Sequence, residues 1–281
     1  MKTYIITDST SEISQKTAKE NDIIVIPMSV SFGDKVYLDG IDMFHDEFYE
    51  KLEKSDRLPT TTQVTPQGYR EVFEEILKDP EAEIFGLFLS STLSGSFNSC
   101  RLAIEEMETD RVQVIDSLTV TGGLGLLVFI ADDLRKRGLR AKEIKARMED
   151  IIPRLEIMMA FTTLKYLKAG GRISASSAAV GSLLRIVPVA RMDKGEIVSI
   201  GKLRGKAPAM DFMFQKVDAA PADPQYPVAF MHAQSEDMCE KLHSRYKETY
   251  PLENSLFFSM GPVVGTYSGP GCFGMAYIRK D

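Results

Sequence analysis

Short apolar runs alternate with stretches of helical periodicity through the first half of the chain. The apolar runs have the length and composition of buried strands and occupy residues 4–7, 23–30, 84–89 and 112–116. The amphipathic stretches after three of these runs predict helices over residues 9–20, 96–107 and 122–137. The first of these helices opens on a capping-box pattern between Ser9 and Glu12, and Gly138 ends the last one. Continuous apolar strands separated by helices are typical of a parallel sheet that is covered on both faces.

The pattern changes near residue 155. Residues 186–192 and 196–203 flank the turn Asp193-Lys194-Gly195 and predict a β-hairpin. The other expected strands are residues 156–163, 228–232, 255–260 and 273–278, and the expected helices are residues 176–184, 208–217 and 235–250. The sequence therefore predicts an α/β protein of two domains. These are an N-terminal, Rossmann-like parallel-sheet domain over residues 1–155 and a C-terminal α+β domain over residues 156–281.

The composition of the 281 residues narrows the class of protein. The 34 Lys and Arg against 40 Asp and Glu give a formal charge of −6. This charge argues against a nucleic-acid binder and against attachment to an anionic membrane, because both need a basic surface. Cys100, Cys239 and Cys272 are far apart, which predicts neither a disulfide framework nor a zinc ribbon. The longest apolar run, residues 122–131, is about half a membrane span. We therefore expect a cytoplasmic protein without a signal peptide or a membrane span.

Hydroxyl side chains gather where the predicted parallel strands end, which is the edge at which open parallel sheets bind ligands. Clusters lie at residues 7–10, 90–96 and 116–117, and another, residues 59–63, precedes the third strand. Helix caps account for one hydroxyl per helix, but residues 90–96 contain five. Because the clusters contain no Lys or Arg, we expect them to hold one carboxylate or a neutral polar head rather than a polyphosphate. Ser94-Gly95 is the sharpest candidate, since glycine lets backbone and ligand approach closely.

The common catalytic and cofactor motifs are absent or incomplete. The sequence has no phosphate-binding loop, no G-x-S-x-G elbow and no H-E-x-x-H zinc motif. Residues 269–274 match the G-x-G-x-x-G dinucleotide fingerprint, but the seven residues that follow are too few for the helix that it requires. This segment predicts a tight loop that approaches the ligand or the other domain closely. His45, His232 and His243 show no metal-ligand spacing, so we expect no catalytic residue, cofactor or metal.

Basic residues cluster at two turns of the predicted C-terminal domain. They are Lys165, Lys168 and Arg172 around residues 170–171, and Lys202, Arg204 and Lys206 after the hairpin. Two interpretations stay open. The clusters are either an ordinary solvated surface or a docking patch for an acidic partner or a phosphate.

Taken together, several of these segments resemble the DegV family. The matching segments run in order along the chain and are residues 7–10, 59–63, 89–96, 116–117, 164–174 and 261–271. The first three read TDST, PTTTQ and LSSTLSGS, and the last two read LKYLKAGGRIS and GPVVGTYSGPG. Each match is loose alone, but the ordered set is specific.

The resemblance implies a binding protein, not an enzyme, that holds one long-chain fatty acid in a tunnel between two domains. It also implies a partner, a separate fatty acid kinase that phosphorylates the presented carboxylate. By the matching motif positions, Thr61 or Thr62 is expected to hold the carboxylate together with Ser94. The backbone near Gly95 is expected to donate N–H groups to it.

The remaining residues that the resemblance implicates lie in the other motifs. They are Ser9, Arg172 and Tyr267 as ligand contacts, and Arg204 and Lys206 as basic positions at the head group or on the kinase-facing surface. Tyr267 stands where many members of the family carry His. A tyrosine donates a hydrogen bond to a carboxylate but is a poor proton shuttle at neutral pH.

Two rival hypotheses come from the same residues. A serine-dependent hydrolase or acyltransferase acting on small esters would use the serines at the predicted helix start, but it needs a base within reach of Ser94. A kinase-type binder of a small polyol is disfavoured by the missing phosphate-binding loop. Burial of an acyl chain contributes about 0.8 kcal/mol per CH₂, so in the fatty-acid hypothesis the tunnel supplies most of the affinity and the hydroxyls orient the ligand.

Overall fold

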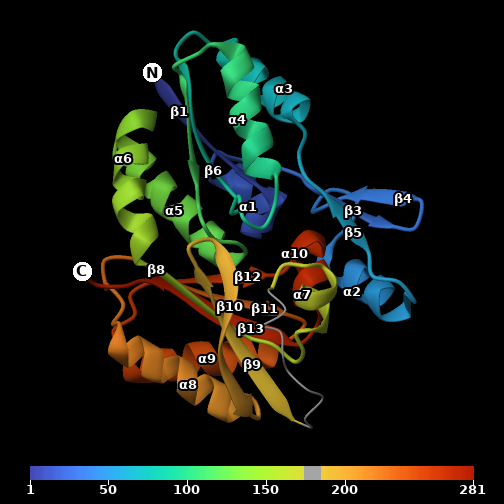
Figure 1. Cartoon of the computed structure of the whole chain (residues 1–281). Coiled ribbons are helices and arrows are strands. Elements are labelled where there is room, and N and C mark those ends of the chain that lie inside the picture. Colours follow the sequence, from blue (N-terminus) through green and yellow to red (C-terminus); the bar gives the residue numbers. More distant parts are fainter. Residues whose placement is uncertain (174–184) are drawn as a thin grey trace.

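The computed structural model describes residues 1–173 and 185–281, and in this part of the chain the strands form three sheets (Figure 1). The first sheet has four parallel strands in the order β2-β1-β6-β7. Its strands are β1 (Lys2–Asp8), β2 (Ile23–Ile26), β6 (Ala82–Phe88) and β7 (Val112–Asp116). The predicted parallel sheet is confirmed, and the complete burial of β6 explains its uninterrupted apolar run.

The second sheet has six strands in the order β10-β9-β8-β13-β11-β12. Neighbouring strands are antiparallel except for β11 and β12. The strands are β8 (Leu155–Ala160), β9 (Ile186–Asp193), β10 (Glu196–Arg204), β11 (Val228–Ala233), β12 (Ser255–Ser259) and β13 (Cys272–Ile278). The predicted hairpin is confirmed as β9 and β10, and helices α8 (Lys206–Ala219) and α9 (Glu236–Thr249) pack on this sheet. The mixed sheet with its helices agrees with the expected α+β C-terminal half.

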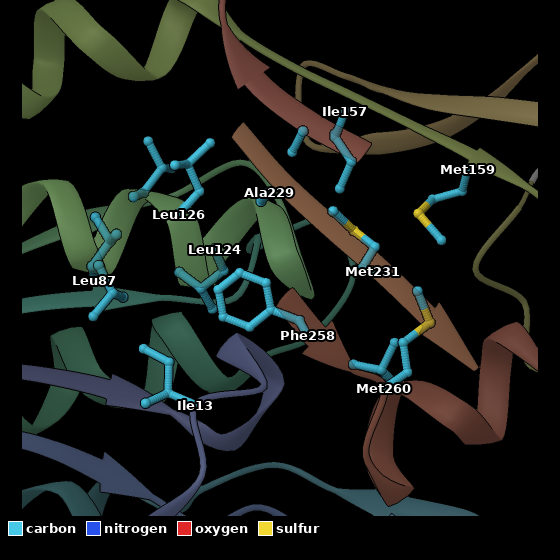
Figure 2. Close-up of a cluster of buried hydrophobic side chains, with 14 of the residues drawn as sticks. Ile13, Leu87, Leu124, Leu126, Ile157, Met159, Ala229, Met231, Phe258 and Met260 are labelled. Carbon is cyan, nitrogen blue, oxygen red and sulfur yellow. The ribbon is translucent and has the colours of Figure 1, made fainter. Parts of the chain in front are cut away.

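Helix α5 (Gly122–Lys136) lies between these two sheets (Figure 1). It contacts β1 and β6 on one side and β8, β11, β12 and β13 on the other. A side chain at Gly122 would overlap Met231 in β11, and one at Gly125 would overlap the ring of Phe258 in β12, so the glycine-rich first turns let the second sheet pack closely. Figure 2 shows Leu124 and Ile157 in the same apolar cluster as Phe258. The two halves therefore share one core, and their division into domains at residue 155 stays a prediction.

The other helices surround the sheets. They are α1 (Gln15–Glu20), α2 (His45–Lys54), α3 (Pro66–Leu77), α4 (Ser96–Met107), α6 (Ala141–Ile151), α7 (Lys165–Ala169) and α10 (Pro262–Ser268). The bounds of α4 match the prediction, whereas the sequence pattern did not reveal α3 and α6. The predicted helix over residues 176–184 lies outside the described residues. Among the helices of the described residues, none has both the length and the apolar character needed to cross a membrane.

The predicted strand over residues 23–30 is wrong in its extent. Strand β2 ends at Ile26, and Pro27, which has no N–H to donate to a ladder, separates it from β3 (Ser29–Phe32). Strand β3 belongs to a small antiparallel sheet with β4 (Lys35–Leu38) and β5 (Thr60–Thr62). This third sheet, with α2 beside it, projects from the body of the protein in Figure 1.

The predicted helix over residues 9–20 is wrong in its start, and its capping box does not form, although the helix ends at Glu20 as predicted. Residues Ser9–Ser11 form a single 3₁₀ turn, and Glu12 then adopts a left-handed conformation with φ of 61°. The helix begins only at Gln15, where the Ser14 side chain caps it. The Glu12 carboxylate instead accepts a hydrogen bond from the N–H of Gly261, at 2.7 Å. A long-range contact replaces the local one that the capping box requires.

Candidate functional site

A cavity of about 160 Å³ lies where the two large sheets meet β5 and α10. Most of the residues that line it are apolar and come from both halves of the chain; they include Met28, Leu89, Val120, Ile157, Met159 and Met260. Polar side chains occupy a minority of the lining positions. Such a wall suits a largely apolar ligand with one polar end.

Three of the expected ligand contacts meet at this cavity. The hydroxyl oxygens of Thr61 and Tyr267 lie 2.6 Å apart. The guanidinium of Arg172 lies 4.6 Å from the centroid of the Tyr267 ring, a cation–π contact, and its Nε donates to the carbonyl of Leu93 at 3.2 Å. Thr61, Arg172 and Tyr267 all line the cavity. Segments that are more than 200 residues apart thus bring one cation and two hydroxyls to one polar group.

Ser94 and Gly95 line the same cavity, at the start of α4. The Ser94 hydroxyl accepts a hydrogen bond from the N–H of Ser96 at 3.2 Å. A Cβ at Gly95 would overlap the Gln63 side chain, whose Nε2 donates to the Ser99 hydroxyl at 2.8 Å. Gln63 also lines the cavity, although the sequence analysis did not select it. Its only sequence signal is its place at the end of the PTTTQ motif.

Three of the other hydroxyls between residues 90 and 96 form hydrogen bonds within the fold. Ser90 donates to the carbonyl of Gly195 at 2.9 Å, and Thr92 donates to the same oxygen. These bonds attach the tip of the β9–β10 hairpin to the end of β6. Ser96 shares a hydrogen bond of 2.9 Å with the hydroxyl of Tyr69. The interpretation of the whole cluster as a binding site is therefore too broad, and Ser94 is the hydroxyl of this segment that reaches the cavity.

Ser9 and Thr62, two further candidates, lie away from the cavity lining. The Ser9 hydroxyl accepts a hydrogen bond from the N–H of Met28 at 3.1 Å and lines a second pocket, described below. Thr62 is exposed, because side chains alternate along β5 and Thr61 takes the inward position. Thr10, next to Ser9, does line the cavity. Of the two candidates in PTTTQ, Thr61 lines the cavity and Thr62 does not, and TDST contributes Thr10 in place of the expected Ser9.

Asp8 orients two parts of the cavity wall. Its carboxylate accepts hydrogen bonds from the N–H of Thr10 and from the N–H of Leu89, both at 2.9 Å. Asp8 is fully buried, and this burial raises the pKa of its carboxyl above the ordinary value. The hydrogen bonds that it accepts oppose the rise. Asp8 therefore acts as a structural link between the ends of β1 and β6.

Two arginines supply positive charge to the cavity wall, one of them the expected Arg172. Arg172 and Arg191 both line it, from the segment after α7 and from β9. Arg191 forms an ion pair of 3.8 Å with Asp193. The clusters themselves contain no Lys or Arg, but the C-terminal half supplies positive charge from across the fold. The site is suited to an anion of low charge.

Arg204 and Lys206 occupy the end of β10 and the start of α8. Both are exposed and neither is part of the cavity lining. Their assignment to a surface that meets a partner stays a prediction.

The glycine-rich loop after α10 packs against the segment around α7. Gly269 and Gly271 have φ of 66° and 81°, and a Cβ at these positions would overlap Tyr166 and Thr162. Thr162 donates to the carbonyl of Pro270 at 2.9 Å. The loop therefore approaches another segment closely, as the sequence predicts, and that segment belongs to the C-terminal half. The loop packs neither on the cavity nor on the N-terminal sheet.

The three histidines lie outside the described lining of the cavity, and none hydrogen-bonds to Ser94 within the described residues. His232 hydrogen-bonds with Ser259 at 3.3 Å, and His243 with Ser255 at 3.1 Å. His45 packs against Tyr49 of α2 with ring centroids 5.3 Å apart. Ser94 thus has no histidine base, which counts against the serine-hydrolase hypothesis.

Comparisons with known proteins agree with this architecture. A family model described as "Uncharacterised protein, DegV family" matches residues 2–280. A DegV domain-containing protein of Clostridium perfringens is 32% identical over 279 residues, which cover 99% of each chain.

Two solved structures share the fold over the full length. One is reported for fatty acid binding of a DegV family protein from Thermus thermophilus; its TM-score is 0.91 at 28% identity, covering 99% of this chain and 100% of the other. The second is DegV, a fatty acid binding protein from Bacillus subtilis, with a TM-score of 0.87 at 27% identity and 100% of both chains covered. The family model and the C. perfringens relative both span almost the whole sequence. The chain therefore belongs to the DegV family.

Proposed function

We propose that this protein binds one long-chain fatty acid in the cavity between its two large sheets. The observation that carries the proposal is the composition of the cavity wall. The wall is mainly apolar, and the hydroxyls of Thr61 and Tyr267 lie together with the guanidinium of Arg172 in one polar cluster. Burial of the acyl chain contributes about 0.8 kcal/mol per CH₂ before entropy losses. The fatty acid binding reported for the Thermus and Bacillus relatives supports the same ligand.

The carboxylate is proposed to lie against Thr61, Ser94 and Tyr267. Hydroxyls donate hydrogen bonds to a carboxylate, and Arg172 adds a charge-assisted interaction from the same side of the cavity. Gly95 permits close approach at the start of α4. In this arrangement the apolar wall provides the affinity, and the polar group sets the direction of the chain.

The bound acid is proposed to be presented to a separate fatty acid kinase, which phosphorylates its carboxylate. The protein itself is then a carrier, in agreement with the absence of a histidine near Ser94 among the described residues. Exposed Arg204 and Lys206 are proposed to contribute to the kinase-facing surface. Tyr267, in place of the histidine of many relatives, keeps a hydrogen-bond donor in the site.

Mass spectrometry of an organic extract of the purified protein tests the proposed ligand directly. A long-chain acid should be present, and adding such an acid to delipidated protein should raise its unfolding temperature. Val120→Phe, which fills part of the cavity, should abolish the shift, whereas Val36→Phe, at a position with 63% exposure, should leave it unchanged. Absence of both the extracted acid and the shift in the wild-type protein would refute the proposal.

A further inference from the structure

Helix α10 carries Tyr267 and Ser268 into the cavity, and two carboxylates of the N-terminal half hold its first turn. The N–H of Gly261 donates to Glu12 Oε2 at 2.7 Å, and the N–H of Val263 donates to Asp39 Oδ2 at 3.3 Å. Glu12 follows the 3₁₀ turn after β1, and Asp39 follows β4. These two bonds join a short helix of the C-terminal half to loops more than 220 residues away in the sequence.

The two carboxylates flank Gly261 closely. A Cβ at Gly261 would lie 2.9 Å from Asp39 Oδ1 and 3.1 Å from Glu12 Oε2. Asp39 is only 4% exposed, and the Ser9 hydroxyl also hydrogen-bonds to it. Both acids belong to the wall of a second pocket, separate from the fatty-acid cavity.

The surroundings of this pair supply no compensating cation within residues 1–173 and 185–281. Asp8 at the end of β1 acts on both acids, and both acids in turn add to the rise that burial causes in the pKa of Tyr49 of α2. His45 of α2 lines the same pocket. Strands β3 and β5, which also contact α10, contain no charged residue. The 3₁₀ turn Ser9–Ser11 contacts α10 and has no charged residue either. On α7, another neighbour, Lys165 and Lys168 are exposed.

We propose that Asp39 and Glu12 are positioning residues for the head-group site, which act by anchoring the first turn of α10 and thereby hold Tyr267 against Thr61. The inference rests on the proposed function, because Tyr267 and Ser268 matter as ligand contacts only if the cavity binds an acid. Neither carboxylate lines the cavity itself. Their effect on the ligand passes through the helix.

The anchor responds to pH, because its two acids are buried side by side. Burial raises the pKa of Asp39 to about 7, and burial together with the nearby Asp39 raises the pKa of Glu12 well above its ordinary value. An opening of α10 hydrates Asp39 and returns its pKa toward the ordinary range. The anchored state therefore binds more protons than the open state, and it loses stability relative to the open state as the pH rises through about 7.

The dissociation constant of a fatty acid, measured at about pH 6 and about pH 8, tests the proposal. Wild-type protein should bind at least about threefold more weakly at the higher pH. Asp39→Asn keeps a carbonyl acceptor for Val263 but cannot ionise, so its affinity should vary less with pH than that of wild type. Asp39→Leu, without an acceptor, should bind weakly at both values. Asp42→Asn, an exposed change in the same loop, should keep the wild-type profile and controls for the loss of one negative charge there. The effect of pH on the ligand itself is common to all variants and cancels in their comparison.

Hydrogen exchange of the protein without ligand separates this proposal from the proposed function. After correction for intrinsic rates, the amides of Gly261 and of residues 263–268 should open more readily at the higher pH in wild type, and this effect should be smaller in Asp39→Asn, which keeps only the titration of Glu12. If both proteins share one exchange profile, the anchor is refuted whatever the ligand. If exchange depends on pH more strongly in wild type than in Asp39→Asn but no fatty acid binds, the role of the two carboxylates in holding α10 is supported and the proposed function is refuted.

Discussion

The hydroxyl oxygens of Thr61 and Tyr267 lie 2.6 Å apart, although 206 positions separate the two residues in the sequence. Thr61 comes from the small sheet and Tyr267 from α10, so one hydrogen bond joins the two halves of the chain at the wall of the cavity. Each hydroxyl keeps further hydrogen-bonding capacity beyond this bond. Under the proposed function, the carboxylate of the ligand uses that capacity.

Thr61→Val is expected to weaken fatty-acid binding, and Thr62→Val to leave it unchanged. The first change removes a hydroxyl that contacts Tyr267 in the cavity, at a cost of about 1 to 2 kcal/mol in binding free energy. The second alters an exposed side chain on the same strand, so the two variants are a matched pair. Titration with a fluorescent fatty acid measures both. Equal affinities for the two variants would contradict the assignment of Thr61 to the site.

A double-mutant cycle with Thr61→Val and Tyr267→Phe should show that the two hydroxyls act as a unit. Tyr267→Phe keeps the ring under Arg172, 4.6 Å from the guanidinium, and removes only the hydroxyl. Since both variants lose the same hydrogen bond, the double variant should bind more tightly than the sum of the single losses predicts, by about 1 kcal/mol. Additive losses would mean that the two hydroxyls contact the ligand independently.

The parts of the fold that the sequence predicts are those whose cause is local. The apolar run of β6 predicts a buried parallel strand because both of its faces are covered, and Ser96 to Met107 has the periodicity of a helix on its own. Pro27 interrupts the predicted strand over residues 23–30 and is visible in the sequence. Because the residues on both sides of it are apolar, the sequence does not show that those after it form β3 and join another sheet. Glu12 shows the opposite case. Its partner, Gly261, lies 249 positions away, so no local pattern reveals it.

The same distinction applies to the site. Ser94 and Gly95 are predictable because hydroxyls and glycine at a strand-to-helix junction face the edge where ligands bind. Arg191 is not, because it lies within a strand and reaches the cavity only through the pairing of β9 with β8 and β10. Whether Ser9 or Thr10 faces the cavity depends on how the chain turns after β1. That turn is set by hydrogen bonds to the buried Asp8, which become visible only in the fold.

Gly195→Ala is expected to destabilise the protein more than Gly33→Ala, although both residues lie in hairpin turns at positive φ. A Cβ at Gly195 would lie 2.6 Å from the Ser90 hydroxyl, whereas nothing lies within 4 Å of a Cβ at Gly33. The backbone penalty of about 1 kcal/mol is common to both, and the overlap at Ser90 adds about 1 to 3 kcal/mol. Chemical denaturation gives the two free energies of unfolding. Similar losses would show that the hairpin tip is not fitted against Ser90.

The free energy of unfolding should fall as the pH rises from about 4 to about 7, through the buried carboxyl of Asp39. Burial raises the pKa of this group from 3.8 to about 7, so between these values the folded state keeps a proton that the unfolded chain has released. The stabilisation is complete below the unfolded pKa and is lost as the pH rises through the folded one, with a slope of up to about 1.4 kcal/mol per pH unit.

Asp39→Asn removes this contribution, because an amide does not titrate, and it also removes the rise that Asp39 adds to that of burial in the pKa of Glu12, which has the same sign. The difference in unfolding free energy, wild type minus variant, should therefore decrease as the pH rises from about 5 to about 7.5. Urea denaturation at several pH values measures it. The exposed change Asp42→Asn, at the same charge difference, should give a nearly constant value. A constant difference for Asp39→Asn as well would mean that Asp39 is ionised throughout this range and that its buried position does not hold a proton.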